Sequence, residues 1–156
     1  MQKEQWTMTG DAVTAVILDV FRLNGRLLIA GDRLVAELGL TSARWQVLGA
    51  IAYAERPEPV AWHARSMGLH RQGIQRIVNE LEAEGTVEFQ PNPHHKRAHL
   101  VVLTPQGQEL FEAAIALQVP WVNSLSSGLK LKDIATTQSV IDELKARLEE
   151  EIDRVA

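Results

Sequence analysis

The stretch that decides the fold is GLHRQGIQRIVNELEAEG, residues 68–85. At 100° per residue its apolar side chains fall on one stripe, made of Ile74, Ile77, Val78 and Leu81. The preceding residues 60–67 are predicted to form a shorter helix, and only Gly68-Leu69-His70 separates the two helices. Two helices joined by about three residues that include a glycine are typical of a helix-turn-helix. The sequence therefore predicts this motif, with residues 70–84 as its second helix.

The face opposite that stripe carries side chains suited to reading DNA bases. It consists of Gln72, Gln75, Arg76 and Asn79, with Arg71 on its flank. In a major groove, Gln and Asn can pair bidentately with adenine, and Arg with guanine. His70 stands where a helix prefers a capping residue, which histidine is not, and we expect it to contact phosphate instead. For a helix considered alone, a plain solvated face is the alternative.

A basic hairpin is predicted directly after this helix. Residues 86–90 and 100–103 have the pattern of strands, and the loop between them is PNPHHKR, residues 91–97. Lys96 and Arg97 lie at its tip, where a lysine can hold phosphate and an arginine can enter a narrow minor groove. Strand, basic loop and strand after a helix-turn-helix form a wing. The tight turn and the wing together favour DNA binding over a merely solvated face.

Amphipathic helices are predicted on both sides of the winged helix-turn-helix. The first covers residues 9–38, with a possible bend near Gly31. A second helix starts at Thr104-Pro105 and runs to about residue 119, where Pro120 stops or kinks it. A looser stretch then leads to a last helix that begins at residue 131 or 133 and ends at 155.

The predicted fold is mainly α-helical with a small β-wing. We expect an N-terminal dimerisation helix in residues 1–40, a DNA-binding winged helix-turn-helix in residues 41–104, and C-terminal dimerisation helices in residues 105–156. The flanking helices are too long and too apolar on one side to be covered by one chain. They are therefore expected to pack on each other and on a second copy.

Composition excludes several classes of protein. The chain has 156 residues, of which 46% are hydrophobic and 23% charged, which argues against a disordered or fibrous protein. It has no cysteine, so disulfides and thiolate metal sites are absent. The net charge is −4, but basic residues gather between 65 and 97 and acids between 142 and 153. A local basic surface is what matters for binding nucleic acid.

No chemical motif points to catalysis or to a cofactor. Nucleophile elbows, phosphate loops, zinc-protease and dinucleotide fingerprints are all missing, and we expect that the protein is not an enzyme. His94, His95 and His99 could be considered for a metal, but proximity to DNA explains them better, and no metal or cofactor is expected. Signal-peptide and membrane-spanning patterns are also missing, which predicts a cytoplasmic protein with no membrane partner.

The sequence resembles the MarR-type regulators. Residues 40–48 are similar to the helix that opens their DNA-binding domain, and residues 68–85 to their recognition helix. Arg97 and residues 103–107 are similar to their wing and to the start of their following helix. The resemblance implies a symmetric homodimer that binds a palindromic operator in double-stranded DNA, usually as a repressor. It also implies release by a small molecule that is often aromatic or anionic.

Two positions depart from the family pattern. The family usually has an acid two residues before the wing arginine, and this chain has His95 there. That acid helps to hold the arginine, so its loss puts the wing geometry in question. In the third helix, His63 stands where the family usually has leucine or isoleucine. It is either a variation in core packing or a polar group sensitive to pH or ligand.

An effector pocket is expected between the flanking helices and the DNA-binding region. Its candidate lining consists of Arg22, Arg26, Trp45, Tyr53 and Phe111. Arginine together with aromatic rings suits an aromatic carboxylate. The alternative is that these aromatic rings are ordinary core residues.

A winged-helix module that binds a protein and never touches DNA is the competing hypothesis. Such a module has no need of several basic side chains on one surface. The placement of Arg71, Arg76, Lys96 and Arg97 therefore distinguishes the two classes.

Overall fold

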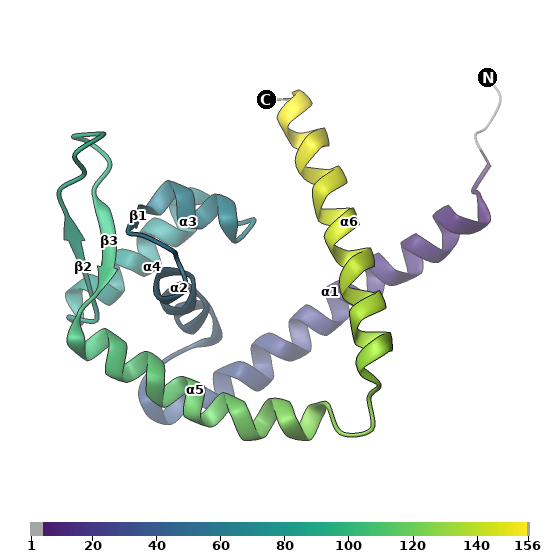
Figure 1. Cartoon of the computed structure of the whole chain (residues 1–156), viewed down its shortest axis with the longest axis horizontal. Helices are drawn as coiled ribbons and strands as arrows, with labels where there is room; N and C mark the ends of the chain where they lie inside the picture. Colours follow the sequence, from purple (N-terminus) through teal and green to yellow (C-terminus); the bar gives the residue numbers. More distant parts are fainter. Residues whose placement is uncertain (1–4, 156) are drawn as a thin grey trace. The chain divides into compact units, whose positions relative to one another are not determined.

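The computed structural model describes residues 5–155, which form two units, residues 5–118 and residues 119–155. The elements in chain order (Figure 1) are α1 (Met8–Val35), a 3-10 turn η1 (Ala36–Leu38), α2 (Ser42–Ala52), β1 (Glu58–Pro59), α3 (Val60–Ser66), α4 (Arg71–Ala83), β2 (Val87–Gln90), β3 (Leu100–Leu103), α5 (Pro105–Leu125) and α6 (Leu131–Val155). The prediction of a mainly α-helical fold with a small β-wing is confirmed.

The core of the first unit gathers the apolar faces of α2, α3, α4, the sheet and the start of α5. The predicted stripe of α4 is in it, because Ile74, Val78 and Leu81 are buried. They belong to the same cluster as Leu48 of α2 and Phe111 of α5. Full burial of one such aliphatic side chain contributes about 1.5–3 kcal/mol. Packing therefore fixes which face of α4 points outward.

The wing is an antiparallel hairpin of β2 and β3 (Figure 1), as predicted, and Val87 lies opposite Leu103 in it. A third strand, β1, pairs with the other edge of β3 and places Glu58 opposite Val101. Sequence reasoning missed β1, since two residues are too few to show alternation. The one local signal is Pro59, because a residue that precedes proline favours extended backbone.

Two helix ends differ from the predictions. The first helix ends at Val35, and its expected last turn is the 3-10 turn η1 before Gly39 (φ 71°). Of the two outcomes expected at Pro120, a stop or a kink, the stop is wrong, because α5 continues through it to Leu125. A proline removes one helical hydrogen bond and frees the carbonyl four residues earlier, here that of Ala116. Ala116 and Pro120 are both exposed, so water can reach this carbonyl and lower the cost.

A close contact joins the end of α1 to the start of α2. The Ser42 hydroxyl donates to the Leu28 carbonyl oxygen over 2.8 Å, and the Ser42 N–H donates to Oδ1 of Asp32 over 2.7 Å. Gly31 is buried against Ser42, and a Cβ there would overlap the Ser42 hydroxyl. The glycine at this position therefore serves the close approach of the two helices, which we call the α1–α2 corner.

Large apolar side chains remain exposed on both flanking helices. On α1 they include Val16, Ile17, Val20, Phe21, Leu23 and Leu27, and on α6 Ile134, Val140, Leu148 and Ile152. Among the described residues, no helix is both long enough and apolar enough to cross a membrane.

Candidate nucleic-acid interface

The turn before α4 is built around Gly68, whose φ of 66° lies in the left-handed region that favours glycine. The N–H groups of Gly68 and Leu69 donate to carbonyl oxygens of α3, which closes that helix. His70 occupies the N-cap position of α4, and its side chain makes no capping hydrogen bond. The exposed imidazole of His70 therefore stands at the start of α4 without a structural task there.

The outward face of α4 is the predicted base-reading face. One open groove is lined by Arg71, Gln72, Gln75, Arg76 and Asn79, together with Glu80 and Ala83. Gln75 Nε2 donates to Asn79 Oδ1 over 2.9 Å, and Arg76 Nη1 lies 3.5 Å from Glu80 Oε1. Pairs at this spacing contribute only about 0.2–0.5 kcal/mol each. They hold the side chains in place but can be exchanged for contacts to bases.

A second hollow, of about 240 Å³, lies between α4 and the wing. Arg71, Gln75 and Asn79 line it from α4, and Arg97 and His99 line it from the wing. The structure thus brings together predicted DNA-binding residues from segments that are about 20 residues apart in the chain. Gln72 and Arg76 line the open groove on the outward face of α4 instead.

The wing loop is organised by Asn92, which sequence reasoning missed. Its Nδ2 donates to the Ala98 carbonyl oxygen over 2.9 Å, and its Oδ1 accepts from the His94 N–H over 3.0 Å. The signal was present, because asparagine between two prolines is a typical loop former. The hairpin therefore forms although His95 replaces the family's acid.

Lys96 and Arg97 are exposed at the tip of the wing. Within residues 5–155, no carboxylate lies at ion-pairing distance from either side chain. The same part of the chain holds no group of three histidine, aspartate or glutamate side chains placed to bind a metal ion. Both cations are available to a phosphate backbone.

His63 of α3 is completely buried, with its ring edge-on to Trp62 at a centroid distance of 5.3 Å. Neither ring nitrogen has a hydrogen-bond partner among the described residues. Burial lowers the pKa of His63 below its ordinary value, and the neighbouring Glu58 opposes this only in part. The ring is therefore a core residue in its neutral form.

We expect the protein to lose stability in mild acid because of His63. The unfolded state takes up the proton near pH 6.5, while the folded state resists it, so the stability is complete above that pH and falls as the pH drops toward the lowered pKa. Denaturant unfolding of the parent and of His63→Leu between pH 5 and 8 measures this, and the variant should show the flatter dependence. His99→Gln, at an exposed site, is the control and should keep the pH dependence of the parent. Equal slopes of the unfolding free energy against pH for the parent and His63→Leu would show that His63 is not the cause.

The structure brings one pair of the five predicted effector residues together from different helices. Tyr53 and Phe111 form an edge-to-face pair with ring centroids 5.4 Å apart. Trp45 packs against the core, near Gly31. Arg22 and Arg26 have their polar contacts within α1, where Arg22 pairs with Asp19 and Arg26 donates to the Arg22 carbonyl oxygen.

Tyr53 also lines a hollow of about 500 Å³ at the end of α2, which the effector prediction did not include. The other lining side chains include Arg56, Glu58 and Trp62. This hollow offers two aromatic rings and an arginine, the combination that was expected of α1, α2 and α5, although Arg56 Nε is already paired with Glu58 Oε1 over 2.7 Å.

Comparison with known proteins places the chain in a family. A profile of the MarR family matches residues 38–98, which contain α2, α3, α4 and most of the wing. An uncharacterised protein of Mycobacterium tuberculosis is 34% identical over 135 residues, which cover 86% of this chain and 91% of that protein. A solved transcriptional regulator, PA3341, has 27% identity and a TM-score of 0.74 over 86% of this chain and 98% of its own.

The chain belongs to the MarR family of transcription regulators. Another relative is the transcriptional activatory protein BadR of Rhodopseudomonas palustris, with 32% identity over 87 residues, or 53% of this MarR-family chain and 48% of BadR. The fold is shared with the repressor CouR bound to a 23-mer DNA duplex, with a TM-score of 0.73 and 20% identity over 91% of this chain and 99% of that one. CouR of Rhodococcus jostii RHA1 has also been solved with p-coumaroyl-CoA, with a TM-score of 0.74 and 22% identity over 83% of this chain and 90% of that one.

Proposed function

We propose that this MarR-family chain is a sequence-specific regulator that binds double-stranded DNA with α4 in the major groove and the wing alongside it. The observation that carries this proposal is the hollow shared by α4 and the wing, where Arg71, Gln75 and Asn79 meet Arg97. A module that binds only proteins has no need of arginines from two segments on one surface. The DNA-bound structure of CouR supports the same use of the shared fold.

Base reading and backbone contact fall to different residues in this proposal. The base-reading set consists of Gln72, Gln75, Arg76 and Asn79, and the backbone set of His70, Arg71, Lys96 and Arg97. The first set lies on the outward face of α4, whereas the second lies at its N-terminal end and on the wing. Phosphate contacts fix the register of a protein on DNA, and base contacts supply the discrimination.

The regulator is proposed to act as a homodimer formed by the helices of residues 1–40 and 105–156. The exposed apolar side chains of α1 and α6 support this, because a monomer rarely leaves so many uncovered. Sedimentation equilibrium of the full chain tests it. A single species of twice the chain mass is expected, and a monomer at all concentrations would contradict the proposal.

Release by a small aromatic or anionic effector is the finer part of the proposal. The exposed ring of Tyr53 beside Phe111, and the hollow that Tyr53 shares with Trp62, provide stacking surfaces. Arg56 is the cation of this hollow, and an anionic ligand would share it with Glu58, to which it is paired over 2.7 Å. The structure of CouR with p-coumaroyl-CoA supports a ligand of this class. Repression is proposed over activation.

Because the relative BadR is an activatory protein, the direction of regulation needs its own test. A reporter gene under the selected operator distinguishes repression from activation.

Selection of the purified protein against a random duplex library at moderate salt tests DNA binding. We expect enrichment of an inverted repeat whose half-sites lie about one helical turn apart. Such a repeat would give the operator motif and support the dimer. No enrichment, with only weak salt-sensitive retention, would favour the protein-interaction module.

Replacing Lys96 with alanine is expected to weaken binding to all duplexes alike. The side chain is exposed at the wing tip, where it can neutralise one phosphate but reads no base. The slope of log K against log salt should decrease in magnitude by about 1. Fluorescence anisotropy with the selected operator and a scrambled duplex at several salt concentrations measures this. A loss confined to the operator would show that Lys96 discriminates sequence.

A further inference from the structure

Two charged residues stand at helix ends where their own helix disfavours them. Arg44 lies in the first turn of α2, at the positive end of that helix dipole. Glu84 is the C-cap residue of α4, at the negative end of its dipole. Cations are stabilised at the C-terminal end of a helix and anions at the N-terminal end. Neither residue is therefore explained by the stability of its own helix.

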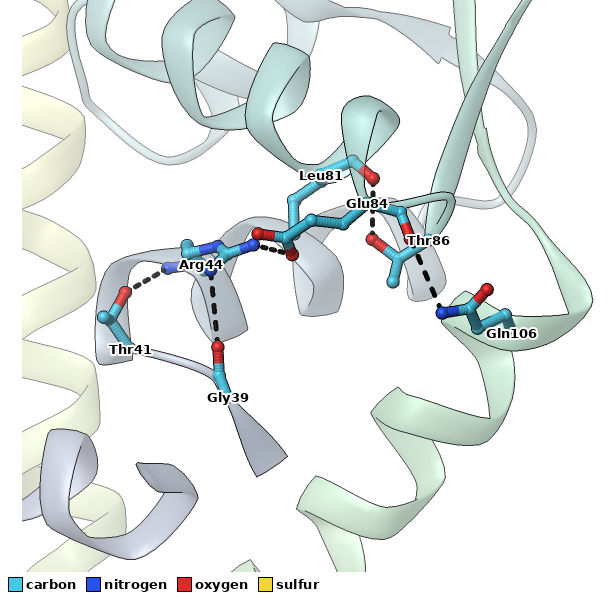
Figure 2. Close-up of polar contacts among 7 residues, drawn as sticks. All are labelled: Gly39, Thr41, Arg44, Leu81, Glu84, Thr86 and Gln106. Atoms are coloured by element: carbon cyan, nitrogen blue, oxygen red, sulfur yellow. Dashed lines mark hydrogen bonds and ion pairs between the residues drawn. The ribbon is translucent and has the colours of Figure 1, made fainter. Parts of the chain in front are cut away.

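The two residues pair with each other, as Figure 2 shows. Arg44 Nη2 and Glu84 Oε2 form an ion pair, and Arg44 Nη1 donates to the Gly39 carbonyl oxygen over 3.3 Å. The Arg44 side chain is only 16% exposed, and its buried Nε has no hydrogen-bond partner among the described residues. A guanidinium buried to this degree is costly unless its partners stay in place. The pair therefore depends on the position of the end of α4.

The opposite side of the same helix end is held by the start of α5. Gln106 Nε2 donates to the Glu84 carbonyl oxygen over 3.5 Å, and the Thr104 hydroxyl donates to the Gly85 carbonyl oxygen over 2.6 Å. Figure 2 shows Arg44 and Gln106 reaching Glu84 from two different helices. The C-terminal end of α4 is thus fixed between the α1–α2 corner and α5.

We infer that Arg44 is a positioning residue for the recognition helix. Through Glu84 it fixes the end of α4 against the α1–α2 corner, and so sets the angle at which the base-reading face of α4 meets DNA. This inference rests on the proposed function, because it concerns how the same face binds its operator. Arg44 acts on DNA only through Glu84.

Arg44 and Glu84 carry opposite charges, so a direct effect on DNA and a positioning effect predict different changes in affinity when each charge is removed. If the two charges acted on DNA directly through space, removing the cation of Arg44 would weaken binding and removing the anion of Glu84 would strengthen it, since DNA is a polyanion. If the pair positions α4, both removals weaken binding. Glu82 is a matched control because it is an exposed acid on the last turn of α4 that belongs to none of the ion pairs among the described residues.

The experiment uses the full chain and the operator obtained by selection. The Kd is measured by anisotropy for the parent, Arg44→Gln, Glu84→Gln, the double variant and Glu82→Gln, over a range of salt. We expect both single variants to lose about five-fold or more in affinity with an unchanged salt slope. The double variant should be no weaker than the weaker single variant, because both changes break one contact. Glu82→Gln should bind as tightly as the parent or more tightly.

Binding by Glu84→Gln that equals or exceeds that of the parent would overturn the inference, as would additive losses in the double variant. Glu84 is half exposed, so this variant decides the question even if Arg44→Gln fails to fold. Thermal unfolding of each variant identifies such a failure. A parent that selects no duplex would overturn the proposed function and the inference with it, whereas a parent that binds and a tight Glu84→Gln variant would overturn the inference alone.

Discussion

Replacing Gly107 with alanine is expected to lower the free energy of unfolding by about 1–3 kcal/mol. Gly107 is buried in the first turn of α5, where a Cβ would overlap the carbonyl oxygen of Thr86. That carbonyl accepts the Thr104 N–H over 3.1 Å, and the Thr104 hydroxyl in turn accepts the Gly107 N–H over 3.1 Å. Neither backbone can move without breaking the start of α5. The steric cost therefore exceeds the gain of about 1 kcal/mol that alanine normally brings to a helix.

Gly73→Ala is the matched control for this prediction. Gly73 also lies inside a helix, but a Cβ there would have nothing within 4 Å. Alanine should therefore stabilise the protein by up to about 1 kcal/mol. Denaturant unfolding at fixed protein concentration compares the two variants. If both substitutions changed the free energy of unfolding in the same direction, close approach to Thr86 would not be the reason for glycine at position 107.

Replacing Arg76 with alanine should weaken binding to the selected operator by about 1–3 kcal/mol and relax the preference at one base pair. Arg76 is exposed on the outward face of α4, and its one ion pair among residues 5–155, with Glu80, is long at 3.5 Å and solvated. The guanidinium is therefore free to pair bidentately with a guanine. Anisotropy measures the affinity, and a repeated library selection with the variant measures the preference.

Arg76→Lys separates base reading from charge. Lysine keeps the positive charge but presents no planar fork of donors, so the bidentate contact is lost. We expect this variant to keep the salt slope and the affinity for scrambled duplexes, and to lose the preference at the same base pair as Arg76→Ala. Full retention of that preference would mean that Arg76 contacts phosphate.

The recognition helix and the wing could be predicted because their signals are local. The apolar stripe of Ile74, Val78 and Leu81 has the helical period, and Gly68 and Gly85 mark the two ends. The outward face of α4 follows from the stripe by geometry alone. Base-reading candidates on that face were therefore accessible from the sequence, although their roles on DNA stay predictions.

Features that depend on contacts between distant segments could not be predicted. The need for glycine at Gly107 arises from a carbonyl 21 residues earlier in the chain, and that of Gly31 arises from Ser42. A stop at Pro120, one of the two outcomes expected there, was wrong because the cost of a proline depends on whether the freed carbonyl meets water. Local propensity carries no information about such surroundings.

In the candidate site, too, residue types could be predicted from the sequence, whereas the contacts between distant segments could not. Arg71 and Arg97 were both predicted from residue type, but their meeting in one hollow requires the packing of the wing beside α4. Of the predicted effector residues, Tyr53 and Phe111 are brought together from α2 and α5, whereas Arg22 and Arg26 contact each other only along α1. The three predicted residues outside the aromatic pair were chosen by residue type and by the helix that carries each of them, and neither the helical period nor a turn signal linked them to one cavity.

The unpaired arginine of the wing has a kinetic consequence. An arginine held by a carboxylate must exchange that partner before it can engage phosphate, whereas Arg97 is exposed and has no such partner among the described residues. Under the proposed function, we therefore expect the wing to engage any duplex at first encounter, which favours fast association and sliding along non-specific DNA. We expect α4 to supply the discrimination between sequences, and with it the time that the protein spends on a site.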